Sequence, residues 1–417
     1  METGLKTQLG IQHAAQSDVG LRRTNNQDSH VVHLATSEEA WLRNGHLFIV
    51  ADGMGAHAAG ELASKLAVDT IPLTYQKNRD KPAHVALQKA IQEANHIIHH
   101  RGLANPDFQG MGTTASALVL LPRGAIVAHV GDSRVYRLRG AQLDQLSFDH
   151  SLVWELTAAG QIAGGSPAIP RNIITRSLGP NPDVEVDLEG PFPVAPGDVF
   201  LLCSDGLSGE VKDEEIGIIL QCLPPEEAAQ LLIDMANLRG GPDNITVIIA
   251  RVTAHLNEAA DVAPAPSAGG GIHPSVWGVL GLSVLVAGAL AAASYPIPAL
   301  IAGGVGVILA LLMSNILGGK PDELPRGRLG RGPHRTFSCQ PNSAFVQELN
   351  RIFEQLRSAA VEEDWRLDWA HIEKLTRSAQ QAVARKDFAT AIADYGRTIS
   401  FMMRELKRQS AAGPTGG

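Results

Sequence analysis

The sequence predicts an α+β protein with a strand-rich first part, a hairpin of two apolar helices and a helical last part. Three observations lead to this prediction. Residues 1–255 of the 417-residue chain contain several short β-branched or aliphatic runs bounded by turn residues. Residues 276–294 and 297–317 carry no charged side chain. Residues 342–409 place apolar side chains at helical spacing.

Composition and charge narrow the class of protein. Hydrophobic residues make up 44% of the chain, which is too apolar for a disordered protein. The cysteines, Cys203, Cys222 and Cys339, are too few and too widely spaced for a disulfide framework or a CxxC metal site. Residues 1–255 hold 19 Lys/Arg and 29 Asp/Glu, which argues against nucleic acid as a partner. No export signal is recognisable at the start, so a cytoplasmic N-terminus is expected.

Aspartates mark the junctions of several strand-like runs. The four acids that abut such runs, and a fifth ahead of an apolar segment, are Asp52, Asp132, Asp205 and Asp243, with Asp28 as the fifth. Five carboxylates brought together would repel one another, so bound cations are the expected compensation. Carboxylates without a clustered Cys/His set indicate Mg²⁺ or Mn²⁺ rather than zinc. Glycine after Asp52 would let the Gly53 carbonyl approach such an ion.

Eight motifs between residues 8 and 253 strengthen this interpretation. They are SDVGLRRTNNQDS, FIVADGMGAHAAGELAS, MGTTASALVL, HVGDSRVYRL, DHSLV, RNIITRSLG, GDVFLLCSDGLSGEV and GGPDNITVIIARV. In this order they resemble the motif set of metal-dependent protein phosphatases of the 2C type, bacterial branch. The resemblance implies that residues 8–255 form a four-layer α/β/β/α sandwich of two antiparallel sheets, with metals at one edge. It also implies phosphorylated proteins as substrates.

The resemblance assigns roles to individual residues. It implies that Asp52 bridges two metal ions and that Gly53 contributes its carbonyl. It further implies that Asp205 and Asp243 bind the first ion and that Asp28 holds water bound to the second. Asp132 would bind a third ion. Two Mn²⁺ or Mg²⁺ ions, or three, are therefore the expected cofactors. Arg23 matches the arginine that grips the substrate phosphate, and guanidinium suits phosphate oxygens bidentately. A water bridging two cations loses a proton near neutral pH and can attack phosphorus.

Two positions depart from the family pattern, and one histidine has two interpretations. Gln27 stands where many members carry Glu, which removes one negative charge beside the second ion. Ala56 replaces a glycine that is usual before the histidine. His57 is the candidate general acid for the leaving serine or threonine oxygen, with a packing or capping role as the alternative.

Residues 155–172 correspond to the family's flap beside the active site.

The rest of the chain divides into four parts. Residues 256–275 are predicted to be a Pro/Ala/Gly linker, and 276–317 a transmembrane hairpin whose spans would be about 28 and 32 Å long. A buried hairpin in a soluble domain is the alternative. Residues 318–341 are predicted to be a basic tether, which places both flanks in the cytoplasm by the positive-inside tendency. Residues 342–409 are predicted to be helical, either as a tetratricopeptide-like pair or as a plain hairpin.

The predicted protein is thus a membrane-anchored serine/threonine phosphatase with a lipid bilayer, phosphoproteins and, by analogy, a cognate membrane-associated serine/threonine kinase as partners. The predicted location is the inner membrane, with two spans and a cytoplasmic catalytic domain and C-terminus. One alternative is a catalytically weak, phosphatase-like membrane scaffold that binds partners through its helical tail. Another is a hydrolase of small phosphate esters or nucleotides.

Overall fold

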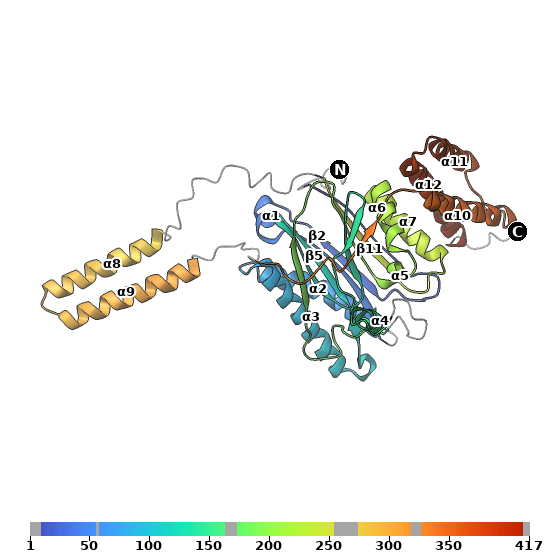
Figure 1. Cartoon of the computed structure of the whole chain (residues 1–417). Helices are drawn as coiled ribbons and strands as arrows, with labels where there is room; N and C mark the ends of the chain where they lie inside the picture. Colours follow the sequence, from blue (N-terminus) through green and yellow to red (C-terminus); the bar gives the residue numbers. More distant parts are fainter. Residues whose placement is uncertain (1–9, 56–57, 163–172, 254–273, 318–326, 412–417) are drawn as a thin grey trace. The chain divides into compact units, whose positions relative to one another are not determined.

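Two antiparallel sheets form the body of the protein (Figure 1). The computed structural model describes residues 10–55, 58–162, 173–253, 274–317 and 327–411. Sheet A has the strand order β1 (Ile11–Asp18), β11 (Ile245–Val252), β10 (Val199–Cys203), β7 (Arg134–Arg139), β8 (Gln142–Gln145) and β12 (Arg335–Ser338). Sheet B has the order β2 (Asp28–His33), β3 (His46–Met54), β5 (Ala115–Leu121), β6 (Gly124–Val130) and β9 (Asp187–Phe192), with β4 (Gly112–Thr113) beside β3.

Alternating side chains build the layers around the two sheets. On β3, Phe48 and Val50 enter the core between the sheets, whereas Leu47 and Ile49 face the other way. Because successive strand residues point to opposite faces, a strand buried on both faces reads as a continuous apolar run. Helices α2 (Ala59–Lys77) and α3 (Ala83–Ala104) cover sheet B, and α6 (Asp213–Cys222) and α7 (Pro225–Leu238) cover sheet A. The predicted α+β class with two antiparallel sheets is confirmed.

Shorter helices lie in the connections. They are α1 (Glu38–Asn44), a 3₁₀ turn at Pro106–Phe108, α4 (Leu152–Ala158) and α5 (Asp205–Ser208). Residues 155–158 of helix α4 belong to the segment predicted to be the flap, and none of the helix's residues is fully buried. Residues 163–172 of that segment lie outside the described residues.

A helical hairpin occupies the uncharged part of the chain. Its helices are α8 (Pro274–Ala292) and α9 (Pro296–Leu317). They approach closely, since a Cβ placed at Gly306 would overlap the Ser283 side chain. Within the described residues, however, no helix combines the length and the apolar character that a membrane crossing requires. The prediction of two transmembrane helices over 276–317 is therefore not supported, although both segments are helical.

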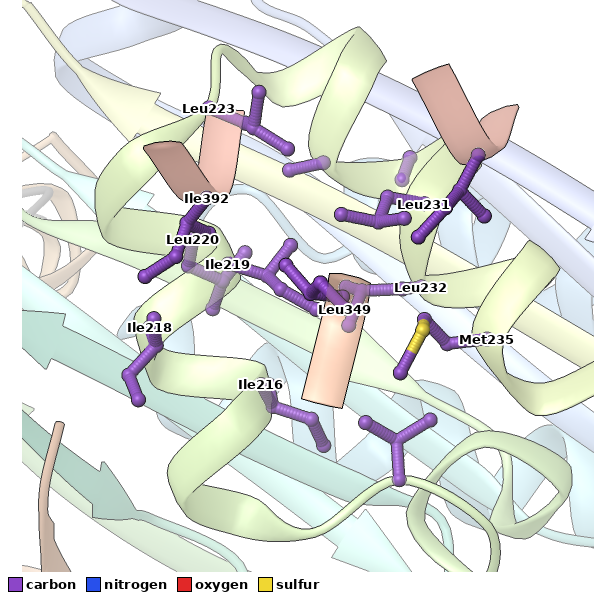
Figure 2. Packing of buried hydrophobic residues seen from close by; sticks show 14 of the residues in the cluster. Ile216, Ile218, Ile219, Leu220, Leu223, Leu231, Leu232, Met235, Leu349 and Ile392 are labelled. Carbon is purple, nitrogen blue, oxygen red and sulfur yellow. The ribbon is translucent and has the colours of Figure 1, made fainter. Parts of the chain in front are cut away.

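The last part of the chain packs onto the two-sheet domain (residues 10–253). Three helices, α10 (Ser343–Glu362), α11 (Trp369–Ala384) and α12 (Phe388–Ala411), form a layer outside α6 and α7. Figure 2 shows Leu349 of α10 and Ile392 of α12 among apolar side chains of α6 and α7. A Cβ at Gly217 of α6 would overlap Cys339, so the chain before α10 also docks closely.

The segment predicted to be a tether contains structure that the prediction did not include. Residues 335–338 form β12, which extends sheet A beyond β8. Just before this strand, Glu189 on β9 accepts hydrogen bonds from Gly332 N at 2.7 Å and His334 Nε2 at 2.9 Å. Glu189 is buried, and a buried carboxylate needs such partners. Residues 329–338 are thus held by the edges of both sheets.

Candidate active site

The topology brings the five predicted aspartates to one end of the sandwich. Asp28 and Asp52 are opposite each other on β2 and β3. In sheet A, Asp205 follows β10 and Asp243 precedes β11, and the end of β10 pairs with the start of β11. Asp132 lies in the turn by which the chain passes from β6 of sheet B to β7 of sheet A. Strand ends that meet at one edge therefore place all five acids together.

Hydrogen bonds from neighbouring loops orient these acids. Ser204 Oγ donates to Asp28 Oδ2 at 2.7 Å. The backbone of Asp52 is clamped by Thr114, whose Oγ1 accepts from Asp52 N at 2.9 Å and whose N donates to Asp52 O at 2.8 Å. Asp243 Oδ1 accepts from Asn244 N at 2.8 Å. The carboxylates of Asp28 and Asp243 and the backbone of Asp52 are thus held by bonds within the protein.

Burial and mutual repulsion shift the pKa values of four of the acids upward. Burial first, and then the charges of Asp205 and Asp243, raise the pKa of Asp28 to about 7. Burial and Asp205 raise the pKa of Asp132 to about 8. The pKa of Asp52 is raised well above its ordinary value by burial and by Asp28, and that of Asp205 by burial and Asp243. The cluster therefore holds its negative charge only at a free-energy cost.

Three carboxylate oxygens of these acids lack a hydrogen-bond partner among the described residues and indicate which kind of ligand would relieve this free-energy cost. Asp28 Oδ1, Asp132 Oδ1 and Asp205 Oδ1 are buried without a hydrogen-bond partner in the described part of the chain. A hard divalent cation prefers carboxylate oxygens and would satisfy them. Among the described residues, no group of three His, Cys, Asp or Glu side chains is already arranged to hold a metal ion. The oxygen donors of the five aspartates are of the chemical kind that Mg²⁺ and Mn²⁺ prefer.

Arg23 lies at the rim of the acid cluster (Asp28, Asp52, Asp132, Asp205 and Asp243). Its Nη2 donates to Asp243 Oδ2 at 2.7 Å, and half of its side chain is exposed. The pKa of Arg23 is raised, mainly by the hydrogen bond to Asp243, so the guanidinium is charged at any relevant pH. A fixed, half-exposed guanidinium beside the acids is placed to meet an anionic group that enters the site.

Gly53 is required by packing. A Cβ at this position would overlap the carbonyl oxygens of Gly60 and Gln27, between which the end of β3 passes. Gly53 N also donates to Gln27 O at 3.1 Å. Its predicted contact with a metal stays a prediction, but the absence of a side chain already has a structural reason.

Of the remaining predicted positions, the structure describes Gln27 but not Ala56 or His57. Gln27 points its side chain toward the start of α2, with Nε2 3.4 Å from Gly55 O. His57, the candidate general acid, and Ala56 lie outside the described residues. Their predicted roles therefore stay predictions.

Three positioning residues were not singled out from the sequence. Asn244 Oδ1 accepts from Gln27 N at 2.8 Å, and Asn244 Nδ2 donates to Val19 O and Asn25 O at 2.9 and 3.0 Å. Asn244 thereby fastens the loop that carries Arg23 to the start of β11. Ser204 and Thr114 act in the same way on Asp28 and Asp52. Ser204 in CSDG and Asn244 in PDNIT stand directly beside predicted aspartates, and Thr114 lies in the GTTA motif. These positions were the sequence signal by which the three residues could have been found.

Comparisons with known proteins agree with this geometry. The family model described as protein phosphatase 2C matches residues 22–240. A putative protein phosphatase 2C-type from Streptococcus pyogenes is 39% identical over 253 residues, which cover 59% of this chain and 98% of that protein. The serine/threonine protein phosphatase PstP of Mycobacterium tuberculosis is 38% identical over 251 residues, covering 58% of this chain and 45% of PstP.

Two solved structures of serine/threonine phosphatases are similar to this chain. The M. tuberculosis serine/threonine phosphatase PstP/Ppp superposes with a TM-score of 0.51 and 36% identity, covering 58% of this chain and 99% of that chain. The S. agalactiae serine/threonine phosphatase superposes with a TM-score of 0.52 and 36% identity over the same shares. Helices α10–α12 and strand β12 lie outside the family match at residues 22–240.

Proposed function

Because the chain belongs to the protein phosphatase 2C family, we propose that it is a metal-dependent phosphatase that hydrolyses phosphoserine and phosphothreonine in proteins. The observation that carries this proposal is the acid cluster, with buried carboxylate oxygens that have no partner and pKa values raised by burial and by mutual repulsion. A protein gains nothing structural from such a cluster, whereas cation binding would remove its cost.

The residues of the site have separate roles in this proposal. Asp28, Asp52, Asp132, Asp205 and Asp243, with the Gly53 carbonyl, would hold two or three Mn²⁺ or Mg²⁺ ions. When bound, such ions supply Lewis acidity toward the phosphate and a hydroxide nucleophile near neutral pH. Ser204, Thr114 and Asn244 keep the acids and the Arg23 loop in place. His57 stays the proposed proton donor to the leaving oxygen.

Arg23 is proposed to hold the substrate phosphate, and Arg23→Lys tests this role. Lysine keeps the charge but loses the planar fork that binds two phosphate oxygens. Losing one charge-assisted hydrogen bond costs about 1.5–3 kcal/mol. We therefore expect kcat/KM on a phosphoserine peptide to fall roughly ten- to a hundredfold. The neighbouring Arg22→Lys, on an exposed side chain, is the matched control and should retain kcat/KM.

Metal binding separates the two ways in which Arg23 could act. If Arg23 served mainly to assemble the metals, excess Mn²⁺ would restore the activity of Arg23→Lys. Full restoration, or an unchanged kcat/KM in this variant, would contradict the phosphate role.

The choice of substrate distinguishes the proposal from its alternatives. With Mn²⁺ present, the full chain should release phosphate from phosphoserine and phosphothreonine peptides more efficiently, in kcat/KM, than from p-nitrophenyl phosphate. A small-ester hydrolase would show the reverse order. A catalytically weak scaffold would show almost no turnover of either, and the complete set of acids does not favour that alternative. A serine/threonine kinase as the opposing enzyme stays a prediction by analogy.

The location of the chain is a separate proposal, which rests on the sequence. We propose that the segment 274–317, which contains no Asp, Glu, Lys or Arg, anchors the protein at the inner membrane with both flanks in the cytoplasm. The described residues before the segment, from 83 up to 253, and after it, from 327, belong to one compact unit, which supports placing both flanks on the same side. Detergent, but not high salt, should extract the protein from membranes. Extraction by salt alone would contradict the anchor.

A further inference from the structure

A large cavity begins at the acid cluster and leads away from it. Its volume is about 1020 Å³, which is the size of a binding pocket for a substantial ligand. Asp132 and Asp205 line it at the catalytic end. The other walls come from α4, from the loop between α5 and α6, and from β12 with the residue before it.

Strand β12 supplies a wall that the family match does not include. Arg335 lies with its guanidinium carbon 5.3 Å from the ring centre of Trp154 on α4 and 4.6 Å from that of Phe337. The guanidinium carbon of Arg134 also lies close to Trp154, 5.7 Å from the ring centre. Phe148 meets Trp154 edge-on with ring centres 5.8 Å apart. Side chains from three parts of the chain thus gather around Trp154.

Four charged groups of this cavity are paired with one another. Arg134 contacts Asp149 at 2.8 Å and Asp213 at 3.4 Å. Asp213 also accepts from Tyr136 Oη at 2.6 Å. Arg335 lies 3.8 Å from Asp213, and its side chain is 43% exposed. Beside these paired groups and the charged side chains of Glu210, Lys212 and Glu214, the cavity offers a ligand an apolar surface. This surface comes from Val153, Trp154 and Phe337.

We infer that this cavity binds the stretch of substrate polypeptide that adjoins the phosphorylated residue, and that Arg335 and Phe337 of β12 make it selective for a large apolar side chain there. The inference rests on the proposed function. The occupant follows from continuity, since the cavity opens at the acids where the phosphate reacts, so the group that enters it belongs to the same substrate molecule. Arg335 contributes through cation–π contacts with the rings of both Trp154 and Phe337.

Two matched phosphoserine peptides test the inference. One carries leucine on each side of the phosphoserine, and the other carries serine at the same positions. The full chain with Mn²⁺ should prefer the leucine peptide about tenfold in kcat/KM, as expected for an apolar group entering a fitting pocket. Arg335→Ala and Phe337→Ala should reduce this preference to about twofold or less. Arg331→Ala, on an exposed residue of the same segment that does not line the cavity, is the control and should retain the preference.

The outcomes distinguish this inference from the proposed function. Phe337 is partly buried, so Phe337→Ala could lose the preference through misfolding alone. The Arg335 side chain is 43% exposed, so Arg335→Ala tests the cavity with less effect on the fold. Equal kcat/KM for the two peptides with the parent protein, or an unchanged preference in Arg335→Ala, would overturn the inference while leaving the phosphatase assignment intact. No turnover of p-nitrophenyl phosphate or of either peptide by the parent protein would overturn both.

Discussion

A chain that ends after residue 256 is expected to be unfolded or insoluble. Helices α6 and α7 are buried on all sides: six consecutive residues, 215–220, are buried on α6, and seven, 231–237, on α7. A helix at a protein surface has a polar face, so this pattern requires a cover. The cover consists of α10 and α12, with Leu349 and Ile392 fully buried against α6 and α7 (Figure 2).

The size of the expected effect follows from the packing. Removing one buried leucine side chain costs about 2–5 kcal/mol. Domains are stable by only about 5–15 kcal/mol, so the loss of several such contacts exceeds the total. Soluble expression and circular dichroism of residues 1–256 would measure this. A soluble fragment with the melting temperature of the full chain would contradict the expectation.

A point substitution tests the same interface without truncation. Leu349→Asp places an unpaired charge among the apolar side chains of α6 and α7 and should lower the melting temperature strongly. Gln355→Asp introduces the same charge on the exposed side of α10 and should leave the melting temperature almost unchanged. If both variants melted alike, the layer formed by α10–α12 would not be stabilising the two-sheet domain.

The second large effect is expected from Asp205→Asn. Asparagine fills the same space but removes a charged metal ligand. Loss of a residue that only supports a metal ligand already lowers metal affinity or activity about 10- to 100-fold. We therefore expect kcat to fall by more than about 100-fold in this variant. Because Asp205 repels Asp28, Asp52 and Asp132, its neutralisation should raise the melting temperature of the metal-free protein. Activity and stability should therefore change in opposite directions.

Thermal unfolding with and without Mn²⁺ completes this test. Binding at 100 times the dissociation constant stabilises a protein by about 2.7 kcal/mol, so the parent should melt higher with Mn²⁺. Asp205→Asn should lose most of that increase. Asp69→Asn, on an exposed residue that pairs with Lys65, is the matched control and should behave like the parent. A destabilised metal-free Asp205→Asn would show that Asp205 acts as a structural residue instead.

Much of the site was predictable because its chemistry is local in sequence. Each aspartate lies at the start or end of a strand-like run, and the recurrence of this arrangement indicated a shared site before the strand order was known. The hydrogen bonds of Asn244 could not be predicted in this way, because they join residues more than 200 positions apart. Only the tertiary structure brings the loop at residues 19–27 against β11.

The association of the last helices with the two-sheet domain was harder to predict. Periodicity correctly indicated helices over 342–409, but an amphipathic helix does not reveal its partner. The signal lay elsewhere, in EIGIIL of α6 and AAQLLIDMA of α7, which carry apolar side chains around most of each helix. Strand β12 was missed because RTFS is short and follows a Pro/Gly/Arg stretch typical of linkers. Its pairing with β8 and the anchor at Glu189 are long-range contacts.

The most direct test of the central claim, that the acid cluster is a metal-activated phosphatase centre, is a Mn²⁺ titration of phosphate release from a phosphoserine peptide by the full chain. The parent should be inactive in excess EDTA and should regain activity to saturation as free Mn²⁺ rises. Asp205→Asn should stay inactive at every Mn²⁺ concentration that saturates the parent. Turnover by the parent in EDTA, or parent-like turnover by folded Asp205→Asn, would contradict the account.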